Sequence, residues 1–347
     1  MVNQSPEFVR TSTGAAMMLG FKKGFFYRDA VPYCVNLLLD YEGGCFGRCA
    51  FCGLARGRDL AASKKGQSFI RVAWPSYSLD EIAKAIPGRP NLVKRICVSM
   101  ITHARAAKDT AEIVRRLRSA TDAPISVLVS PTVIEKSDLE AFKAAGADKI
   151  GVAIDACTPA LFERLRGHGV KGPHKWERYW ECLAEAADVF GRGNIGAHLI
   201  AGIGETEEEM ARAIQRMRDM GGETHLFSFY PEPGSAMESS GPPAMDAYRR
   251  IQIARYLVDK DLARADAFSF GEGGRIESFG IAPAALEAVI ASGEPFRTSG
   301  CVGRDGTVAC NRPFANAPPG PDFRNYPFAP EKEDLERIRE QMEGSAS

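Results

Sequence analysis

The sequence predicts an α/β protein whose core is a partial TIM-type barrel of β/α units, (β/α)6, followed by a cysteine-bearing C-terminal extension. Short aliphatic runs typical of buried parallel strands recur along residues 34–230, and amphipathic segments that begin with helix-capping residues lie between them. No GxGxxG motif follows the first run, which disfavours a dinucleotide-binding fold. Alternation of this kind is typical of a parallel sheet with crossover helices.

The expected strands cover residues 34–41, 95–100, 124–130, 149–155, 194–202 and 225–230. Capping chemistry marks the helix starts between them, in the pairs Ser78 with Glu81, Asp109 with Glu112, Ser137 with Glu140, Thr158 with Pro159, and Thr206 with Glu209. Each strand is thus followed by a helix, as a barrel of this type requires.

The pattern changes after residue 230. Helices are expected over residues 245–262, 283–290 and 331–342, with a Gly-, Pro- and Arg-rich irregular stretch over 291–330. We therefore expect an N-terminal extension (1–28), a barrel core (29–235) and a C-terminal extension (236–347).

Composition excludes several classes of function. Among 347 residues, 44 basic side chains balance 44 acidic ones, so no overall charge would draw the chain to nucleic acid or an anionic membrane. No run approaches the roughly 20 apolar residues that a membrane helix needs, and the N-terminus lacks the order of a signal peptide. We expect a cytoplasmic protein whose nine cysteines are ligands or core residues rather than disulfides.

The strongest motif is CFGRCAFC, which places Cys45, Cys49 and Cys52 on one loop directly after the first predicted strand. Structural zinc sites usually have four protein ligands. Three thiolates on one loop can instead hold a [4Fe-4S] cluster and leave its fourth iron without a protein ligand. The alternatives are zinc with a remote fourth ligand, or a chance grouping.

The CxxxCxxC spacing and the β/α alternation over residues 30–235 resemble the radical SAM superfamily. The resemblance implies that S-adenosylmethionine chelates the open iron and that an electron from the reduced cluster cleaves its sulfonium. The 5′-deoxyadenosyl radical then abstracts hydrogen from an unreactive C–H bond. It also implies an electron donor such as ferredoxin or flavodoxin.

The same resemblance implies contacts with S-adenosylmethionine. Phe51 matches the aromatic near adenine, and Asp155 matches the position that binds the ribose. Arg166 and Arg178 are candidates to pair with the methionyl carboxylate. An ordinary core phenylalanine, a helix-capping aspartate and solvated helix arginines are the alternative interpretations.

The segment HLIAGIGE resembles the adenine motif GxIxGxxE of that family through Ile200, Gly202 and Glu205. His198 replaces the first glycine.

Residues 155–180 and 198–210 are similar to biotin synthase and lipoyl synthase, the sulfur-inserting members of the superfamily. Both sacrifice a second iron–sulfur cluster. Biotin synthase carries cysteines on barrel strands two, three and five, and only Cys97 matches them here. The N-terminal three-cysteine motif and the Arg-Ser-Ser-Tyr run of ordinary lipoyl synthase are absent from the sequence.

The irregular stretch contains Cys301 and Cys310 in TSGCVGRDGTVACNRPF, and Asn-Tyr-Pro follows. This stretch resembles the biotin-synthase-like subunits of two-component lipoyl synthases. The resemblance implies that two homologous radical SAM proteins each insert one sulfur into an octanoyl chain. A lysine of a lipoyl carrier protein would carry that chain.

A second, auxiliary [4Fe-4S] cluster would then take Cys301, Cys310 and Cys34, with Cys97, Ser299 or an exogenous sulfur species as further ligand. Cys34 and Cys97 are alternatively core thiols. Cys157 and Cys182 lack partner spacing, and we interpret both as structural.

Polar residues of the tail and of the loop after the fourth strand remain. The tail residues are expected to recognise the carrier or to fold over the pocket, unless the tail is solvated; they are Arg304, Arg312, Phe314, Arg324 and Tyr326. His168 and His174 are expected to make loop contacts rather than to bind metal. Rival functions are another radical SAM reaction, such as a mutase or methylating enzyme, and a non-catalytic iron–sulfur or zinc scaffold.

Overall fold

A computed structural model describes residues 3–58 and 68–344. Its main sheet has eight strands in the order β10-β9-β8-β7-β6-β2-β1-β5. The parallel strands are β2 (Cys34–Leu39), β6 (Arg95–Ser99), β7 (Ile125–Val129), β8 (Lys149–Asp155), β9 (Ile195–Ala201) and β10 (Glu223–Ser228). They confirm the predicted α/β class and the predicted strands.

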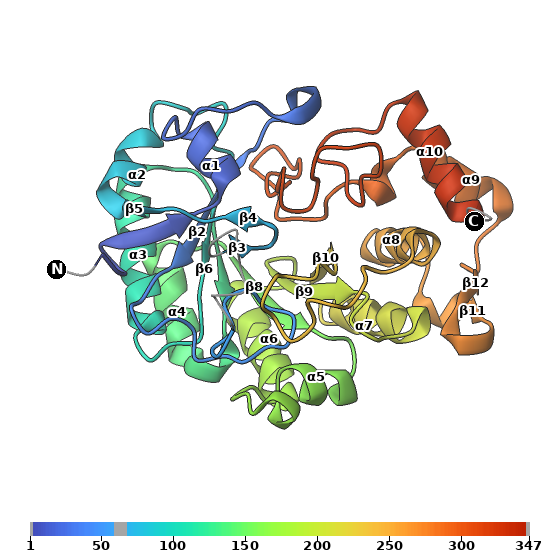
Figure 1. Cartoon of the computed structure of the whole chain (residues 1–347), viewed down its shortest axis with the longest axis horizontal. Coiled ribbons are helices and arrows are strands. Elements are labelled where there is room, and N and C mark those ends of the chain that lie inside the picture. Colours follow the sequence, from blue (N-terminus) through green and yellow to red (C-terminus); the bar gives the residue numbers. More distant parts are fainter. Residues whose placement is uncertain (1–2, 59–67, 345–347) are drawn as a thin grey trace.

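Helices cover the outer face of this curved sheet (Figure 1). They are α2 (Leu79–Ala85), α3 (Ala106–Ala120), α4 (Lys136–Ala145), α5 (Pro159–Leu165), α6 (Trp176–Phe190) and α7 (Glu207–Asp219). Outward strand residues such as Val35, Ile96 and Val127 are fully buried beneath the helices. Burial of this aliphatic layer is the main favourable contribution to folding of the barrel.

Three of the predicted helix starts are confirmed. Ser78 with Glu81 and Thr206 with Glu209 form reciprocal capping boxes at α2 and α7. The Thr158 side chain accepts the N–H of Leu161 at the start of α5.

The other two predicted starts are wrong. α3 begins at Ala106, before Asp109, because the Asp109 carboxylate turns inward and accepts a hydrogen bond from Tyr41 Oη at 3.0 Å. α4 begins at Lys136, before Ser137, because Asp138 instead accepts the N–H of Glu135 at 2.9 Å.

The N-terminal segment joins the main sheet. β1 (Phe8–Thr11) pairs antiparallel with both β2 and β5 (Ser76–Ser78), and α1 (Thr13–Met18) follows it. The short strands β3 (Ser68–Phe69) and β4 (Val72–Ala73) form a separate hairpin.

The C-terminal helices are α8 (Met245–Asp259), α9 (Pro283–Ala291) and α10 (Lys332–Glu343), with a small hairpin of β11 (Ser269–Phe270) and β12 (Ile276–Ser278). The segment between α9 and α10 runs back toward α1 and the open side of the sheet (Figure 1). Asn311 Nδ2 donates to the Val31 carbonyl at 2.8 Å, and Phe314 stacks on Phe26 at 4.8 Å. Arg312 and Tyr326 are buried, so the solvated-tail alternative is wrong for this part of the tail, whereas Arg304 is exposed.

Within the described residues, no helix is both long enough and apolar enough to cross a membrane.

Candidate active site

Inward-facing side chains of the parallel strands line one cavity of about 230 Å³. Residues two apart on a strand point to the same face, which explains the alternating pattern of the lining. It includes Cys34, Asn36 and Leu38 of β2, Cys97 and Ser99 of β6, Leu128 of β7, Ala153 and Asp155 of β8, His198 and Ile200 of β9, and His225 and Phe227 of β10. Val129 and Ser228, the last residues of β7 and β10, line it as well. The loop after β2 and the segment 300–316 complete the walls.

The loop after β2 brings Cys45, Cys49 and Cys52 to this cavity. Backbone bonds fix the loop on neighbouring elements: the Phe46 N–H donates to the Thr102 carbonyl and the Ala50 N–H to the Leu165 carbonyl, both at 2.8 Å. The loop is therefore held at the carboxyl ends of the strands, where barrels of this kind place their active sites.

Each sulfur of this triad accepts a hydrogen bond. The Gly47 N–H lies 3.3 Å from Cys45 Sγ, the Leu54 N–H lies 3.4 Å from Cys52 Sγ, and Arg166 Nε lies 3.4 Å from Cys49 Sγ. Burial raises the pKa of Cys49, against the nearby Arg166 charge, and burial raises the pKa of Cys52 as well. A positively charged metal group would be needed to hold these buried thiols as thiolates.

Arg166 links the triad to the end of β8. Its guanidinium forms an ion pair with Asp155 at 3.0 Å and donates to the Ile154 carbonyl at 2.7 Å, and Arg166 is 5% exposed. Asp155 itself has a left-handed backbone, with φ of 65°. Burial raises the pKa of Asp155, whereas Arg166 lowers it. This pair positions a carboxylate beside the cysteine loop.

Behind Arg166, His174 Nδ1 lies 2.6 Å from Thr132 Oγ1 and 2.9 Å from Tyr179 Oη. Burial lowers the pKa of His174 to about 2, and Arg166 contributes, so the ring is neutral. A Cβ at Gly47 would meet His174 Nε2 at 3.0 Å, which explains glycine within the cysteine motif. His168 is instead on the surface, beside Glu163.

The residues that match S-adenosylmethionine contacts of the superfamily do not all have the same role in this structure. Phe51 and Ile200 line the cavity with Asp155 and Arg166. Glu205 accepts the Gly202 N–H at 2.6 Å and the Ile203 N–H at 3.0 Å, so it shapes the turn after β9. Gly202 has φ of 97° and packs against Pro243, which requires glycine.

The structure does not bring Arg178 to the cavity. This side chain lies on α6, pairs with Glu185 at 2.8 Å and donates to the Ile134 carbonyl at 3.2 Å. Of the two arginine candidates, Arg166 alone lines the cavity.

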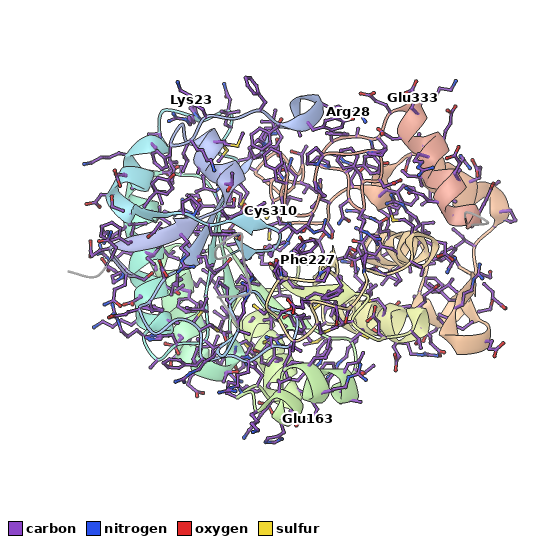
Figure 2. The ribbon with its side chains drawn as sticks, in the orientation of Figure 1. Lys23, Arg28, Glu163, Phe227, Cys310 and Glu333 are labelled. Atoms are coloured by element: carbon purple, nitrogen blue, oxygen red, sulfur yellow. The ribbon has the colours of Figure 1, made fainter. Side chains whose placement is uncertain are left out.

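A second group of thiols lines the same cavity: Cys34, Cys97, Cys301 and Cys310. Asn36 Nδ2 lies 3.5 Å from Cys34 Sγ and 3.4 Å from Cys310 Sγ, so one amide contacts a strand thiol and a tail thiol. Cys310 is labelled near Phe227, between the sheet and the C-terminal segment, in Figure 2. We call these four residues the second thiol group.

The tail turn that carries two of these thiols is tightly closed. The Ala309 and Cys310 N–H groups donate to the Cys301 carbonyl at 3.0 and 3.1 Å, and Val302 bridges Val308. A Cβ at Gly300 would meet the Cys310 carbonyl oxygen at 2.3 Å, so this close approach requires glycine.

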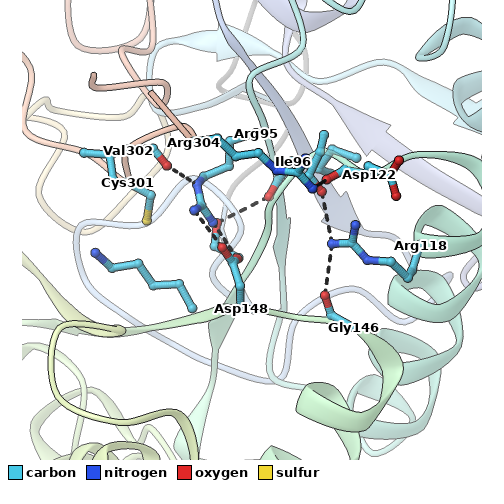
Figure 3. A network of polar contacts seen from close by, with 12 residues as sticks. Arg95, Ile96, Arg118, Asp122, Gly146, Asp148, Cys301, Val302 and Arg304 are labelled. Atoms are coloured by element: carbon cyan, nitrogen blue, oxygen red, sulfur yellow. Dashed lines mark hydrogen bonds and ion pairs between the residues drawn. The ribbon is translucent and has the colours of Figure 1, made fainter. Parts of the chain in front are cut away.

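Arg95 fastens this turn to the barrel. Figure 3 shows its guanidinium between Asp148 and the Val302 carbonyl, beside Cys301. Arg95 pairs with Asp148 at 2.8 Å, donates to Val302 at 2.6 Å and is 4% exposed. Cys301 is thereby held at the amino-terminal end of β6.

The environment of the second thiol group separates the pKa values of its members. Burial raises the pKa of Cys34, whereas a hydrogen bond from Cys34, with the charge of Arg312, lowers the pKa of Cys310 to about 6. His225 Nε2 lies 3.5 Å from Cys301 Sγ. Arg312 stacks on Phe227 at 4.1 Å.

The two thiol groups lie at opposite ends of β2. Cys34 begins the strand and Cys45 follows its end, and the strand itself is roughly 17 Å long at the rise of an extended strand. Apolar side chains, including Leu38 and Phe227, line the space between them.

Sequence reasoning missed two members of this site. Asn36 follows Cys34 by two positions, so strand alternation was a signal that the two share a face. His225 had no local signal, because its contact with Cys301 depends on the position of the tail. Ser299 was a candidate further ligand. Its hydroxyl accepts a hydrogen bond from the Leu226 N–H at 2.7 Å, so it already has a backbone partner.

Among residues 3–58 and 68–344, no set of three or more His, Cys, Asp or Glu forms a ready site for a single metal ion. A [4Fe-4S] cluster presents irons at separate corners, so its ligands stand apart from one another. Three thiols on one loop, each with its own donor and all facing one cavity, fit such a cluster.

The open parallel barrel with a cysteine triad after its first parallel strand defines a class of iron–sulfur enzyme. The sequence matches the radical SAM superfamily over residues 42–217, about half of the chain. The chain belongs to this superfamily, which confirms the resemblance at that level and implies a [4Fe-4S] cluster and S-adenosylmethionine as cofactors. A comparison with curated protein sequences finds no match.

Solved structures with the same fold include methylornithine synthase (PylB), with 14% identity and a TM-score of 0.50 over 71% of this chain and 66% of that one. Another is HydG, a maturase of the [FeFe]-hydrogenase, with 10% identity and a TM-score of 0.51 over 71% of this chain and 53% of that one. The chain thus spans between about half and two thirds of the lengths of these neighbours. At such identities the likeness concerns the fold alone.

Proposed function

We propose that this chain is a radical SAM sulfurtransferase that inserts sulfur into an unactivated C–H bond of an octanoyl chain carried on a protein lysine. It would complete half of a lipoyl group, together with a homologous radical SAM partner. The observation that carries the proposal is the second thiol group, which faces the cysteine triad across one largely apolar cavity.

The triad residues Cys45, Cys49 and Cys52 would hold the first cluster. Bound there with S-adenosylmethionine, the cluster supplies the one-electron chemistry that activates an unreactive C–H bond. Arg166 holds Asp155 and Cys49 in place, and the Gly47 and Leu54 amides point at the other two sulfurs. These donors favour a negatively charged sulfur site.

Cys301, Cys310 and Cys34 would hold an auxiliary [4Fe-4S] cluster as sulfur source, and Cys97 lies within the same group. Asn36 contacts two of these sulfurs, and His225 contacts a third. The apolar wall between the two groups suits an alkyl chain and excludes water. Nine free cysteines favour a reducing, cytoplasmic setting with ferredoxin or flavodoxin as reductant.

Iron and sulfide counts test the proposal. Anaerobically reconstituted protein should hold about eight irons per chain, and the double variant Cys301→Ala, Cys310→Ala about four. Cys182→Ala is the matched control, because Cys182 is fully buried on α6, away from the cavity. Four irons in both the wild type and the double variant would exclude the donor cluster.

The reaction is tested with an octanoylated carrier, with and without a homologous partner. We expect a thiolated product, with loss of sulfide from the auxiliary site during turnover. Release of 5′-deoxyadenosine without sulfide loss would instead indicate another radical SAM reaction. No release of 5′-deoxyadenosine at all would indicate a non-catalytic scaffold.

A further inference from the structure

A buried imidazole inside the cavity contacts a thiol of the C-terminal segment. His225 Nε2 lies 3.5 Å from Cys301 Sγ, and the two residues are 2% and 8% exposed. Among the described residues, Cys301 is the one hydrogen-bond partner of the His225 ring. The ring thus directs its polar contact to the second thiol group.

Backbone contacts fix His225 relative to the tail. β10 is the last strand of the main sheet, so the N–H groups along its outer edge have no further strand to pair with. The Leu226 N–H donates to Ser299 Oγ at 2.7 Å, and the Thr224 N–H donates to Asp259 Oδ1 of α8 at 3.3 Å. Both neighbours of His225 are therefore held, one of them by the tail just before its cysteine turn.

A glycine of the next strand leaves space for the His225 ring. A Cβ at Gly196 of β9 would meet His225 Nε2 at 3.0 Å and the Glu223 carbonyl oxygen at 3.2 Å. His198 lies one strand away, and its ring packs at 83° against that of His225 with centroids 5.4 Å apart. Gly196 therefore provides the room that the His225 ring needs to lie against the tail thiol.

Two cations near Cys301 are each paired with a carboxylate. Lys149 and Arg95 both bring positive charge close to this thiol. Lys149 pairs with Glu223 at 3.1 Å, and Arg95 pairs with Asp148 at 2.8 Å. The carboxylates offset much of the positive charge that these side chains bring to the sulfur.

Hydrogen-bond chemistry assigns the shared proton to the imidazole. A thiolate bound to iron has no proton, so it only accepts hydrogen bonds, and the proton between the two side chains belongs to His225 Nε2. Ser126 also hydrogen-bonds Cys301, but a hydroxyl has one proton, and Ser126 donates to the Ile96 carbonyl at 3.3 Å. Donors to the sulfurs of an iron–sulfur cluster favour its more negative, reduced state.

We propose that His225 is a positioning residue for the auxiliary cluster: its Nε2–H group donates to the Cys301 thiolate and raises the reduction potential of the cluster bound at the second thiol group. This inference rests on the proposed function, because it requires iron at that group. Cys34 and Cys310 share the Asn36 amide, so His225 gives Cys301 a donor of its own.

The midpoint potential of the auxiliary cluster tests this role. In a variant without the triad cysteines, all bound iron belongs to the second thiol group, and a spectroscopic redox titration measures its potential. His225→Leu removes one hydrogen bond to a charged sulfur, so the reduced state should be roughly tenfold less favoured, a midpoint potential lower by about 59 mV. His225→Gln keeps an N–H donor and should lower the potential less. His198→Leu, the same change in the neighbouring ring, is the control and should shift the equilibrium less than about twofold.

Gly196→Ala tests the same contact without a change of the histidine. Its Cβ requires the His225 ring to move, so the potential should change when His225 is present and should not change in the His225→Leu background. An equal change in both backgrounds, or no change in either, would contradict a role of the ring.

Magnetic resonance of the reduced cluster separates a hydrogen bond from direct ligation. We expect an exchangeable proton coupled to the cluster, which His225→Leu removes. A strong nitrogen coupling from ¹⁵N-labelled histidine would identify His225 as an iron ligand and overturn the hydrogen bond. An unchanged midpoint potential in His225→Leu and His225→Gln would overturn it as well. If His225→Leu does not fold, the smaller shift expected for His225→Gln decides.

Failure of this inference is distinguishable from failure of the proposed function. A triad-free protein that binds no iron would exclude the auxiliary cluster and both proposals with it. The expected shift in potential, in an enzyme whose auxiliary cluster loses no sulfide during turnover, would support the role of His225 and contradict sulfur insertion.

Discussion

The two thiol groups of the cavity are assembled in opposite ways. Cys45, Cys49 and Cys52 lie on one loop, whereas the second thiol group combines β2, β6 and a tail turn that begins at Cys301. The first group needs only a loop fixed at two backbone contacts. The second exists only when the C-terminal segment is folded against the barrel.

This difference shows which parts of the molecule support the triad and which support the second thiol group. The triad shares its support with the barrel core, through Arg166 and Asp155. The second group is supported by Arg95 and Asn36, which join the barrel to the tail. Changes in the tail should therefore affect the second group and leave the first intact.

The largest expected effect is loss of the triad. Cys49→Ala removes a ligand that no nearby thiol of the loop replaces, so cleavage of S-adenosylmethionine should fall at least a thousandfold, the scale of loss of a transition-state-stabilising group. Release of 5′-deoxyadenosine by reduced protein measures it. Iron at the second thiol group should remain at about four per chain. Loss of iron from both sites would show that the groups are not independent.

Next in size is the buried support of the triad. Arg166→Gln leaves Asp155 without its counter-ion, which should destabilise the protein by roughly 3–5 kcal/mol in urea unfolding. Arg178→Gln breaks an ion pair that is partly exposed and should cost less than about 1 kcal/mol. Equal costs would contradict the distinction between a site arginine and a helix-surface arginine.

We expect the stability of the protein to depend on pH through Asp259, on the C-terminal side of the barrel. Burial raises the pKa of Asp259 to about 7; Arg255 lowers it, Glu223 raises it, and the Thr224 N–H and Arg218 also lower it. The carboxyl binds a proton in the folded state that the unfolded chain has released, so its contribution to stability is lost as pH rises from about 4 to about 7.

Between pH 5 and pH 7.5 this loss should be roughly 3 kcal/mol for the wild type, at about 1.4 kcal/mol for each pH unit below the folded pKa. Urea unfolding of the wild type and Asp259→Asn at the two pH values measures it. The variant should lack this part of the pH dependence. A parallel fall in both proteins would place the titrating group elsewhere.

Those features of the fold and the site that depend on residues close together in sequence could be predicted from the sequence. The strands, the triad and the capping boxes at Ser78 and Thr206 depend on residues a few positions apart, and the sequence identified them. The helix starts at Asp109 and Ser137 were wrong because a tertiary contact with Tyr41 and a neighbouring capping residue took precedence.

The second thiol group could be predicted from the sequence only in part. Cys301 and Cys310 stood out by their tail motif, whereas the sequence left Cys97 open between a further ligand and a core thiol, because its place in the cavity depends on the barrel fold. Contacts between distant segments require the fold.

The smallest expected effect concerns Asn36, whose amide contacts the sulfurs of both Cys34 and Cys310. In a background without the triad cysteines, all bound iron belongs to the second group. Asn36→Leu should there release iron to a chelator roughly tenfold faster, because two hydrogen bonds worth about 1 kcal/mol or less each are lost. Asn194→Ala, an exposed residue that contacts Phe190, is the control. Unchanged release would mean that the strand and tail thiols are held together by the tail turn alone.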